Sequence, residues 1–216
     1  GELKKYLPEA GKTKILSTFT GIRPLVSQSS VTSTSKIARS HRIFVSDSGL
    51  VTVTGGKWTT ARLMAEQTVS RAARVGGLTD LPSRSEDMRL VGAQDVLDAG
   101  LAEAKSIVEP DSLYGSELAD LTELEGQNPE LKEPWSDGLP YRLSHAVYAI
   151  QKEMAMTLED VMARRTRAFF LNADAVTNSA DKVADAISRY GNVDEGWTSR
   201  ELARLPEIAS RFRTIG

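Results

Sequence analysis

LVTVTGGKWTTAR, residues 50–62, is the stretch of the sequence that best defines the local fold. Its β-branched first half predicts a strand that is broken by the glycine pair at 55–56. Thr59 or Thr60 is the expected N-cap of a helix that runs to about Arg74, because a threonine hydroxyl can accept a hydrogen bond from a free backbone N–H group. The stretch therefore predicts a strand, a glycine turn and a helix in immediate succession.

The glycine turn is a candidate site for an anionic group. Glycines let the backbone approach a ligand closely, and a helix start presents free N–H groups at its positive dipole end. Lys57 adds a mobile positive charge. The turn is not a Walker loop, because Val51 stands where that motif needs glycine, and the chain contains no GxGxxG sequence. The alternative is a plain turn with a surface lysine.

Upstream of this turn the sequence predicts further strands. The runs RIFV and LVTVT within residues 42–54 flank Asp-Ser-Gly at 47–49, which is a hairpin-turn sequence. LSTFTGIRPLV, residues 16–26, predicts a strand, and the Ser/Thr-rich residues 27–36 predict a surface loop. Arg23, beside a proline near the end of that strand, suits bidentate contact with an oxyanion; a surface arginine is the alternative.

Downstream of the glycines at 76–77 the sequence is helical in character. Apolar residues recur at three- and four-residue spacing from Leu143 through Met154 to Val161, which predicts one apolar helical stripe. Prolines separate the expected helices, which cover residues 93–108, 117–125, 143–154, 158–171, 179–190 and 198–213. The methionine and aromatic side chains expected in the core are Met154, Met156, Met162, Phe169 and Phe170.

These patterns together predict a mostly α fold. A short β-containing piece with its connecting helix is expected in residues 1–77, followed by an all-helical C-terminal domain in residues 78–216. Apolar residues make up 40% of the 216 residues, which is enough for a substantial core, and no apolar run is long enough to span a membrane.

Cysteine and histidine counts limit the chemistry. The absence of cysteine excludes disulfides, thiolate metal sites and a cysteine nucleophile, and it fits a reducing cytoplasm. His41 and His145 are the only histidines, so a multi-histidine metal site is excluded and no metal is predicted. His41 lies between Arg39 and Arg42, which by themselves are ordinary loop charges.

Charge is divided unevenly along the chain. Residues 1–62 contain ten Lys/Arg and three Asp/Glu, a net charge of +7, whereas the remainder carries −9. The division indicates two regions with different functions, and the basic region could face an anionic ligand or only solvent. Nucleic acid is disfavoured as a partner, because the basic residues are dispersed and lack interleaved aromatic residues.

Four segments, in consistent order, resemble the family of FAD-dependent (aerobic) glycerol-3-phosphate dehydrogenases. They are FTGIRPLV at 19–26, SKIARSHRI at 35–43, SGLVTVTGGKWTTARLMAEQTV at 48–69 and LPYRLSHAVYAIQKEMAMTLEDVMARRTRAFFLNADA at 139–175. The resemblance implies that residues 78–216 are the helical C-terminal domain, and that the β-containing piece is a remnant of the FAD-binding and substrate domain. Ala61 departs from a threonine-tyrosine pattern that is common in the family.

The resemblance also implies roles for individual residues. The family oxidises sn-glycerol 3-phosphate to dihydroxyacetone phosphate in glycerol metabolism, by hydride transfer to FAD, with quinone as the electron acceptor. Cofactor binding would fall to Gly55, Gly56, Lys57 and Thr59, and substrate binding to Arg23, Arg39 and Lys57. No general base is identified in this chain. His41 is a poor candidate, and the base is expected in the part of the enzyme that this chain lacks.

The chain is expected to be the C-terminal fragment of the enzyme, inactive and without FAD when isolated, because it lacks the GxGxxG fold. The full-length enzyme is expected in the cytoplasm, peripheral to the inner membrane. Unpaired strand edges make a homodimer one expectation for the fragment. Two alternatives remain. One is a stand-alone helical module that binds a partner or regulates it, and the other is a glycerol-phosphate oxidase of the same family that uses oxygen.

Overall fold

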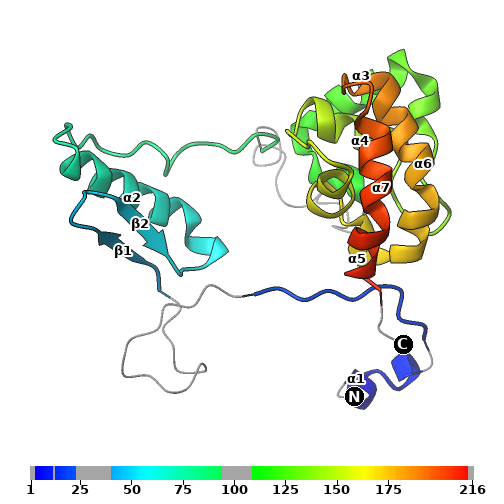
Figure 1. Cartoon of the computed structure of the whole chain (residues 1–216), viewed down its shortest axis with the longest axis horizontal. Helices are drawn as coiled ribbons and strands as arrows, with labels where there is room; N and C mark the ends of the chain where they lie inside the picture. The colour runs from blue at the N-terminus through cyan, green and yellow to red at the C-terminus, as the bar shows by residue number, and fades with distance from the viewer. Residues whose placement is uncertain (1–2, 12, 23–39, 94–108, 214–216) are drawn as a thin grey trace. The chain divides into compact units, whose positions relative to one another are not determined.

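The computed structural model describes residues 3–11, 13–22, 40–93 and 109–213 (Figure 1). The chain divides into two compact units. The hairpin unit lies within residues 21–89, and the helical unit combines residues 1–20 with residues 90–216. The fold is mostly helical with one small sheet, as the sequence predicts. The division into domains at residue 77 stays a prediction.

The hairpin unit contains two antiparallel strands, β1 (Arg42–Val45) and β2 (Val51–Thr54). Ile43 pairs with Val53, and this register places alternate apolar residues on one face of the hairpin. The turn closes where the Gly49 N–H donates to the Ser46 carbonyl at 2.9 Å, and Gly49 has a φ of 84°. Glycine is suited to this left-handed conformation, so the predicted hairpin and its turn are confirmed.

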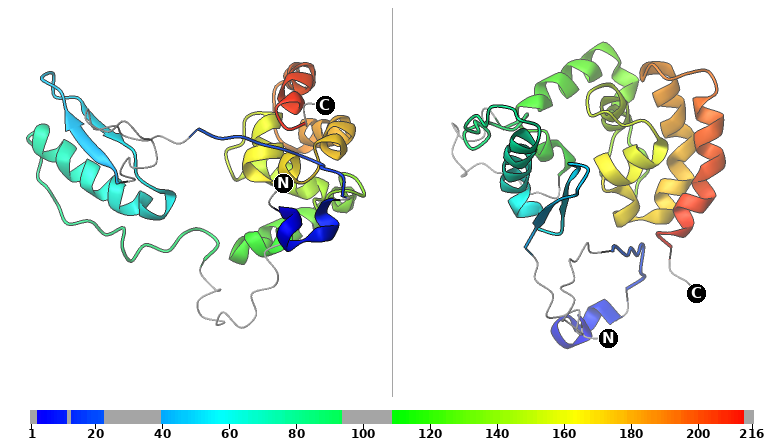
Figure 2. Two further views of the ribbon diagram at one scale, coloured as in Figure 1. Left: turned by 90° about the horizontal axis from the view of Figure 1, so that it is seen from below. Right: turned by 60° about the vertical axis from the view of Figure 1, so that its left-hand side comes forward.

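A single helix, α2 (Ala61–Val75), lies along the hairpin (Figure 2). It follows the short 3-10 turn η3 (Trp58–Thr60), and Gly76 directly follows its last residue. Thr60 is the N-cap residue, but its hydroxyl donates to the Lys57 carbonyl and caps no N–H group.

No described residue of the hairpin unit is buried. Trp58 is 92% exposed and Val69 is 68% exposed. Two strands and one helix cannot enclose a core of their own, so the apolar side chains of this unit remain available to another surface.

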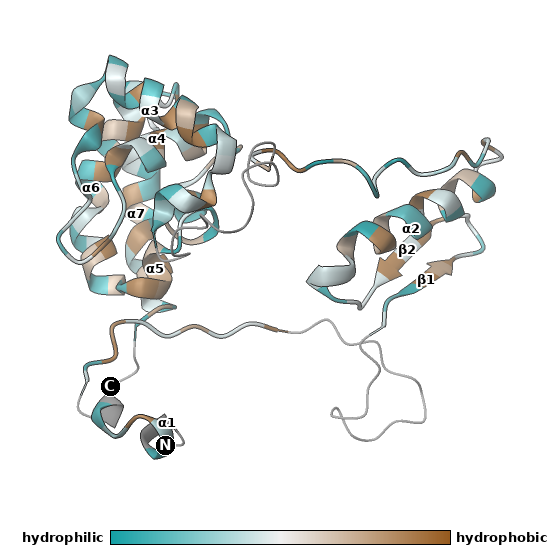
Figure 3. Ribbon diagram, turned by 180° about the vertical axis from the view of Figure 1, so that it is seen from behind, coloured by the Kyte–Doolittle hydropathy of each residue, from teal (hydrophilic) through white to brown (hydrophobic). Residues whose placement is uncertain are grey.

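The helical unit is built around one large hydrophobic core and a smaller cluster of Tyr114, Leu121 and Tyr148. Its principal helices are α3 (Leu118–Gln127), α4 (Leu143–Gln151), α6 (Ala173–Tyr190) and α7 (Trp197–Ser210). Shorter elements complete it: α1 (Leu3–Tyr6), η1 (Pro8–Gly11), η5 (Pro110–Leu113), η6 (Gly115–Glu117), η7 (Pro129–Lys132), η8 (Asp160–Arg165) and α5 (Ala168–Leu171). Hydrophilic and hydrophobic residues alternate along α6 and α7 in Figure 3, as in amphipathic helices with one buried face.

The predicted apolar stripe from Leu143 to Val161 is wrong at its centre. Helix α4 ends at Gln151, and the chain turns through Met154, which has a φ of 57° and is 83% exposed. The turn lets the Ala155 N–H donate to the Ala149 carbonyl at 3.0 Å. Met156 is also exposed, at 78%, so neither methionine belongs to the core.

The predicted helix over residues 158–171 is interrupted. Element η8 is π-helical and ends where both the N–H and the hydroxyl of Thr166 donate to the Val161 carbonyl, at 3.0 and 2.7 Å. Helix α5 then starts afresh at Ala168. Met162 and Phe169 are fully buried, as predicted, and Phe170 is half-buried.

The predicted strand over residues 16–26 is absent from its described part, residues 16–22. Residues 16–18 instead make hydrogen bonds to Ala173, Phe212 and Arg213 of the helical unit, and among them the Leu16 carbonyl and the Thr18 N–H are backbone groups bonded outside any sheet. The helix predicted over residues 93–108 lies almost wholly outside the described residues. Within the described residues, no helix has the length and hydropathy that crossing a bilayer requires.

Candidate functional site

The turn between β2 and α2 requires glycine at both positions. Gly55 and Gly56 have φ values of 76° and 86°, in the left-handed region that other residues rarely adopt. A Cβ atom on Gly56 would collide with the Met64 sulfur and lie 3.1 Å from the His41 Cβ. The close approach of the turn to α2 therefore depends on the missing side chain.

Lys57 follows in extended conformation and is free to bind a ligand. Its side chain is exposed and has no ion-pair partner among the described residues. Its carbonyl accepts from the Thr60 N–H at 3.1 Å and from the Thr60 hydroxyl at 3.0 Å. This pairing holds the start of the helical segment against the lysine backbone.

The same turn leaves backbone donors unused. The N–H groups of Gly56 and Lys57 donate to no acceptor in the described part of the chain. Trp58 and Thr59 begin the helical segment, where N–H groups have no partner within the helix. The chain thus presents donors and one cation along four consecutive residues, an arrangement that suits an anionic or electron-rich group.

The predicted site residues divide into two groups. Gly55, Gly56, Lys57 and Thr59 lie together in the turn, with Lys57 and Thr59 exposed. Arg23 and Arg39 lie outside the described residues, so their roles stay predictions. His41 Nε2 lies 2.7 Å from Gln67 Oε1, and the half-buried ring links the start of β1 to α2.

A second polar cluster lies in the helical unit, and sequence reasoning did not find it. Arg142 Nε donates to Glu125 at 2.7 Å, and the other two guanidinium nitrogens donate to Asp111 at 3.0–3.2 Å. The buried Ser144 hydroxyl donates to the same Glu125 oxygen at 2.6 Å. The only sequence signal is the run Arg-Leu-Ser-His at 142–145, where α4 begins.

His145 completes this cluster as a neutral side chain. Its Nδ1 accepts the Arg142 backbone N–H at 2.9 Å, so Nε2 carries the proton and donates to Asp111 at 3.0 Å. Burial, followed by repulsion from Arg142, lowers the pKa of His145, although Asp111 opposes the shift. Burial would raise the pKa of Asp111, but hydrogen bonds from Arg142 and His145 outweigh it and lower that pKa. Every charge in the cluster has a partner, so the cluster holds structure and offers no free ligand group.

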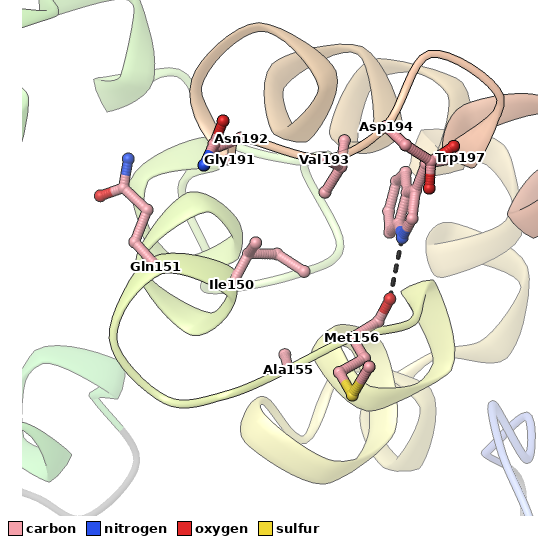
Figure 4. Close-up of a pocket in the computed structure, with 9 residues that line it drawn as sticks. All are labelled: Ile150, Gln151, Ala155, Met156, Gly191, Asn192, Val193, Asp194 and Trp197. Atoms are coloured by element: carbon pink, nitrogen blue, oxygen red, sulfur yellow. Dashed lines mark hydrogen bonds between the residues drawn. The ribbon is translucent and has the colours of Figure 1, made fainter.

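A surface pocket of about 510 Å³ lies between the residues that follow α4 and those that precede α7 (Figure 4). One wall is fixed where Trp197 Nε1 donates to the Met156 carbonyl at 2.8 Å. Asp194 at the rim is already paired with Arg200 at 2.6 Å. The pocket is lined by Ile150, Gln151, Ala155, Met156, Gly191, Asn192, Val193, Asp194 and Trp197. It therefore offers no uncommitted charged group for catalysis.

No group of three or more metal-ligating side chains occurs in the described part of the chain. The glycine turn of the hairpin unit is thus the candidate whose donors and cation have no partner in the described part of the chain, and whose backbone geometry is fixed by glycine. The helical unit supplies a packed core and a structural polar cluster.

Comparison with known proteins defines first the class of protein. Residues 83–197 match the family model described as the C-terminal domain of alpha-glycerophosphate oxidase. The chain therefore belongs to the glycerol-3-phosphate oxidase and dehydrogenase family, which confirms the resemblance noted in the sequence.

The similar curated proteins are glycerol-3-phosphate dehydrogenases. The mitochondrial glycerol-3-phosphate dehydrogenase of Rattus norvegicus is 34% identical over 227 residues, which cover 98% of this chain. The human protein of the same name is 33% identical, as is the probable mitochondrial enzyme of Caenorhabditis elegans, each over 98% of this chain. The chain spans 30% of the length of the rat and human proteins and 31% of the nematode protein.

Proposed function

We propose that this chain is the C-terminal part of a flavin-dependent enzyme that oxidises sn-glycerol 3-phosphate to dihydroxyacetone phosphate. The observation that carries the proposal is the glycine turn, where N–H groups and a lysine, Lys57, that have no partner among the described residues follow a strand. The names of the similar proteins and the family match support the substrate. We also propose that residues 1–77 contribute to the catalytic body and residues 78–216 form the helical domain.

The turn fits one edge of an FAD ring system. Gly55 and Gly56 have no side chain to block a flat ring, and the N–H groups of Gly56 and Lys57 donate to no acceptor among the described residues. FAD, when bound, supplies the hydride acceptor, and its ring gains negative charge on reduction. The turn donors and the Thr59 hydroxyl would stabilise that charge. The chain has no GxGxxG sequence, so the adenosine and pyrophosphate would be held by residues outside it.

Substrate binding would fall to three cations. A phosphate dianion is well matched by guanidinium groups, which can donate two hydrogen bonds at once, and by a lysine ammonium. Lys57 is exposed beside the glycines, so it can serve the substrate next to the flavin ring. Arg23 and Arg39 are assigned to the same phosphate. The reaction removes a hydride from the secondary carbon and a proton from its hydroxyl, and no residue of this chain is assigned that proton.

Lys57→Ala in the complete gene product tests the proposal. Loss of a charge-assisted contact of about 1.5–3 kcal/mol should lower kcat/KM for glycerol 3-phosphate by about ten- to a hundredfold. Arg71→Ala is the matched control, because Arg71 is an exposed cation on α2 whose side chain bonds to no described residue. Near-normal kcat/KM for Lys57→Ala and Arg23→Ala would refute the site.

The electron acceptor is proposed to be a quinone, with the enzyme bound peripherally to a membrane. The family match carries the name of an oxidase, so oxygen is the specific alternative. Peroxide formed in proportion to substrate consumed would establish the oxidase, whereas quinone-dependent turnover without peroxide would support the dehydrogenase.

The 216-residue chain by itself is proposed to be inactive, because much of the FAD site lies outside it. Turnover by the purified chain would contradict this. A homodimer through the hairpin unit is also proposed, and sedimentation of the chain would measure it. If the complete gene product neither binds FAD nor oxidises the substrate, the helical partner-binding module would be the better account.

A further inference from the structure

The glycine turn rests against side chains from both elements of the hairpin unit that flank it. His41 directly precedes β1, and Met64 lies in the first turns of α2, which runs along the hairpin (Figure 1). A Cβ atom placed on Gly56 would lie 3.1 Å from the His41 Cβ and would overlap the Met64 thioether group. The space that a side chain at residue 56 would need is therefore filled by these two residues.

Met64 also contacts the residue that closes the turn. Its sulfur lies 3.6 Å from the Thr60 hydroxyl, which in turn donates to the Lys57 carbonyl at 3.0 Å. The methionine side chain is half-buried, and its unbranched, polarisable thioether suits an irregular space of this kind. One side chain of α2 thus touches the turn at Gly56 and, through Thr60, at Lys57.

His41 is held in place by α2. Its Nε2 atom lies 2.7 Å from Gln67 Oε1, and an amide oxygen can only accept, so Nε2 carries the proton and donates it. Gln67 follows Met64 by three residues, which places both on one face of the helix. The four residues that support the turn in this way, here called the buttress, are His41, Thr60, Met64 and Gln67.

The turn needs such support because glycine restrains the backbone less than any other residue. Gly55 and Gly56 both have positive φ values, and the N–H groups of Gly56 and Lys57 donate to no acceptor among the described residues. No hydrogen bond within the described part of the chain therefore fixes the direction of these two donors. The buttress supplies that restraint through packing at Gly56 and through the Lys57 carbonyl.

We infer that the buttress positions the Gly56 and Lys57 N–H groups against the flavin ring and thereby raises its reduction potential. The inference rests on the proposed function, in which this turn borders the ring. Donors stabilise a developing negative charge strongly only when they are held at the right distance and direction. Loosening the buttress should therefore stabilise the reduced ring less than the intact protein does.

The inference gives His41 a role other than proton transfer. Its Nε2 proton is committed to Gln67, and its Cβ packs behind Gly56. His41 and Met64 are positioning residues, because they act on the flavin ring only through the backbone of the turn.

The test measures the two-electron midpoint potential of FAD in the complete gene product. Met64→Ala removes the thioether behind Gly56, and His41→Ala removes the ring that bonds Gln67. We expect each variant to lower the equilibrium constant for flavin reduction about fivefold, the worth of one hydrogen bond. For a two-electron couple, this is a potential about 20 mV more negative. Gln67→Ala removes the His41 bond from an exposed position and should match His41→Ala.

Two further variants separate positioning from folding. Met64→Leu keeps an apolar side chain of similar size behind Gly56 and should restore the potential. Arg71→Ala, at an exposed position on the same helix, should leave the potential unchanged. A merely structural role would reduce the amount of FAD that the protein retains, but it would not shift the potential of the FAD that stays bound.

The outcomes distinguish this inference from the proposed function. An unchanged potential in Met64→Ala, His41→Ala and Gln67→Ala, while Lys57→Ala lowers kcat/KM, would overturn the inference alone. An equal shift in Arg71→Ala would overturn it as well, because that side chain does not support the turn. A complete gene product that binds no FAD would instead overturn the proposed function.

Discussion

His145 Nε2 lies 3.0 Å from Asp111 Oδ1, and the histidine ring is completely buried. The bond joins the first turn of α4 to the short 3-10 turn η5 (Pro110–Leu113). Arg142, the N-cap residue of α4, binds the same carboxylate. One acidic side chain, Asp111, therefore joins η5 to two side chains at the start of α4. The anchoring of residues 109–114 therefore depends on the protonation states of these groups.

We expect acidification to destabilise the helical unit through His145. Its folded-state pKa is lowered, so below the unfolded-state value of about 6.5 the unfolded chain binds more protons and the free energy of unfolding falls. Asp111 has a lowered pKa as well, so its contribution is lost below about pH 4. Chemical denaturation of the chain between pH 7.5 and 5 measures the first effect.

The two histidines provide matched variants for this measurement. His145→Gln should reduce the pH slope of the unfolding free energy by up to about 1.4 kcal/mol per pH unit, the value for one proton. His41→Gln, in the hairpin unit, should leave the slope of the helical unit unchanged. An unaltered slope in His145→Gln would show that another group controls the acid transition.

Glu153 should lower the free energy of unfolding as the pH rises, which is opposite in sign to the effect of His145. Its Oε2 atom is buried without a hydrogen-bond partner, and burial raises the pKa of its carboxyl, with Glu117 adding repulsion and Arg165 opposing it. Ionisation therefore costs stability as the pH rises above about 4.3. Glu153→Gln should raise the unfolding free energy at pH 8 by up to about 1 kcal/mol, with a smaller gain at pH 5. Glu195→Gln, at an exposed carboxyl, is the control, and equal gains in both variants would contradict this account.

Two methionines allow a core position and a surface position to be compared by the same substitution. Met162 is fully buried, so Met162→Ala should cost about 2–5 kcal/mol through lost contacts and a residual cavity. Met156 is 78% exposed, so Met156→Ala should stay within about 0.5 kcal/mol of the parent chain. Thermal or urea unfolding of both variants measures the difference, and a large loss in Met156→Ala would mean that its side chain has a partner.

The glycine turn should tolerate no side chain at residue 56. Gly56→Ala places a Cβ against Met64 at a φ of 86°, which should cost about 1–2 kcal/mol for the left-handed backbone alone. Exchange of the β1–β2 ladder amides should accelerate by about fivefold or more, which the same free-energy loss implies. Gly76→Ala is the control, because Gly76 has a φ of −80° and the nearest atom would lie at 3.3 Å. Similar exchange in both variants would show that the turn is not constrained.

Local sequence determined much of the fold. The Asp-Ser-Gly turn, the β-branched strands and the glycine breaks define the hairpin and α2 without help from distant residues. Amphipathic spacing located α3, α6 and α7 to within a few residues, except that α6 starts six residues earlier than predicted, at Ala173. The Gly-Gly-Lys motif placed four of the candidate site residues in one turn.

Contacts between distant residues decided where some elements end and which side chains meet, which the local sequence pattern could not predict. The apolar spacing continues through Met154 to Leu158, but Trp197 holds the Met156 carbonyl and Glu201 accepts the Leu158 N–H, so the chain cannot stay helical there. The sequence predicts a strand over residues 16–26, yet the Leu16 carbonyl and the Thr18 N–H bond to Ala173 and Phe212 of the helical unit instead. Asp111 meets His145 across 34 residues. Sequence alone determined the family, the hairpin and most helices, because turns, caps and amphipathic spacing act within a few residues. Only the tertiary structure decided the path of residues 14–19, the pairing of Asp111 with Arg142 and His145, and the exposure of Met154 and Met156. The hydrogen bonds that fix these features join residues that are distant along the chain.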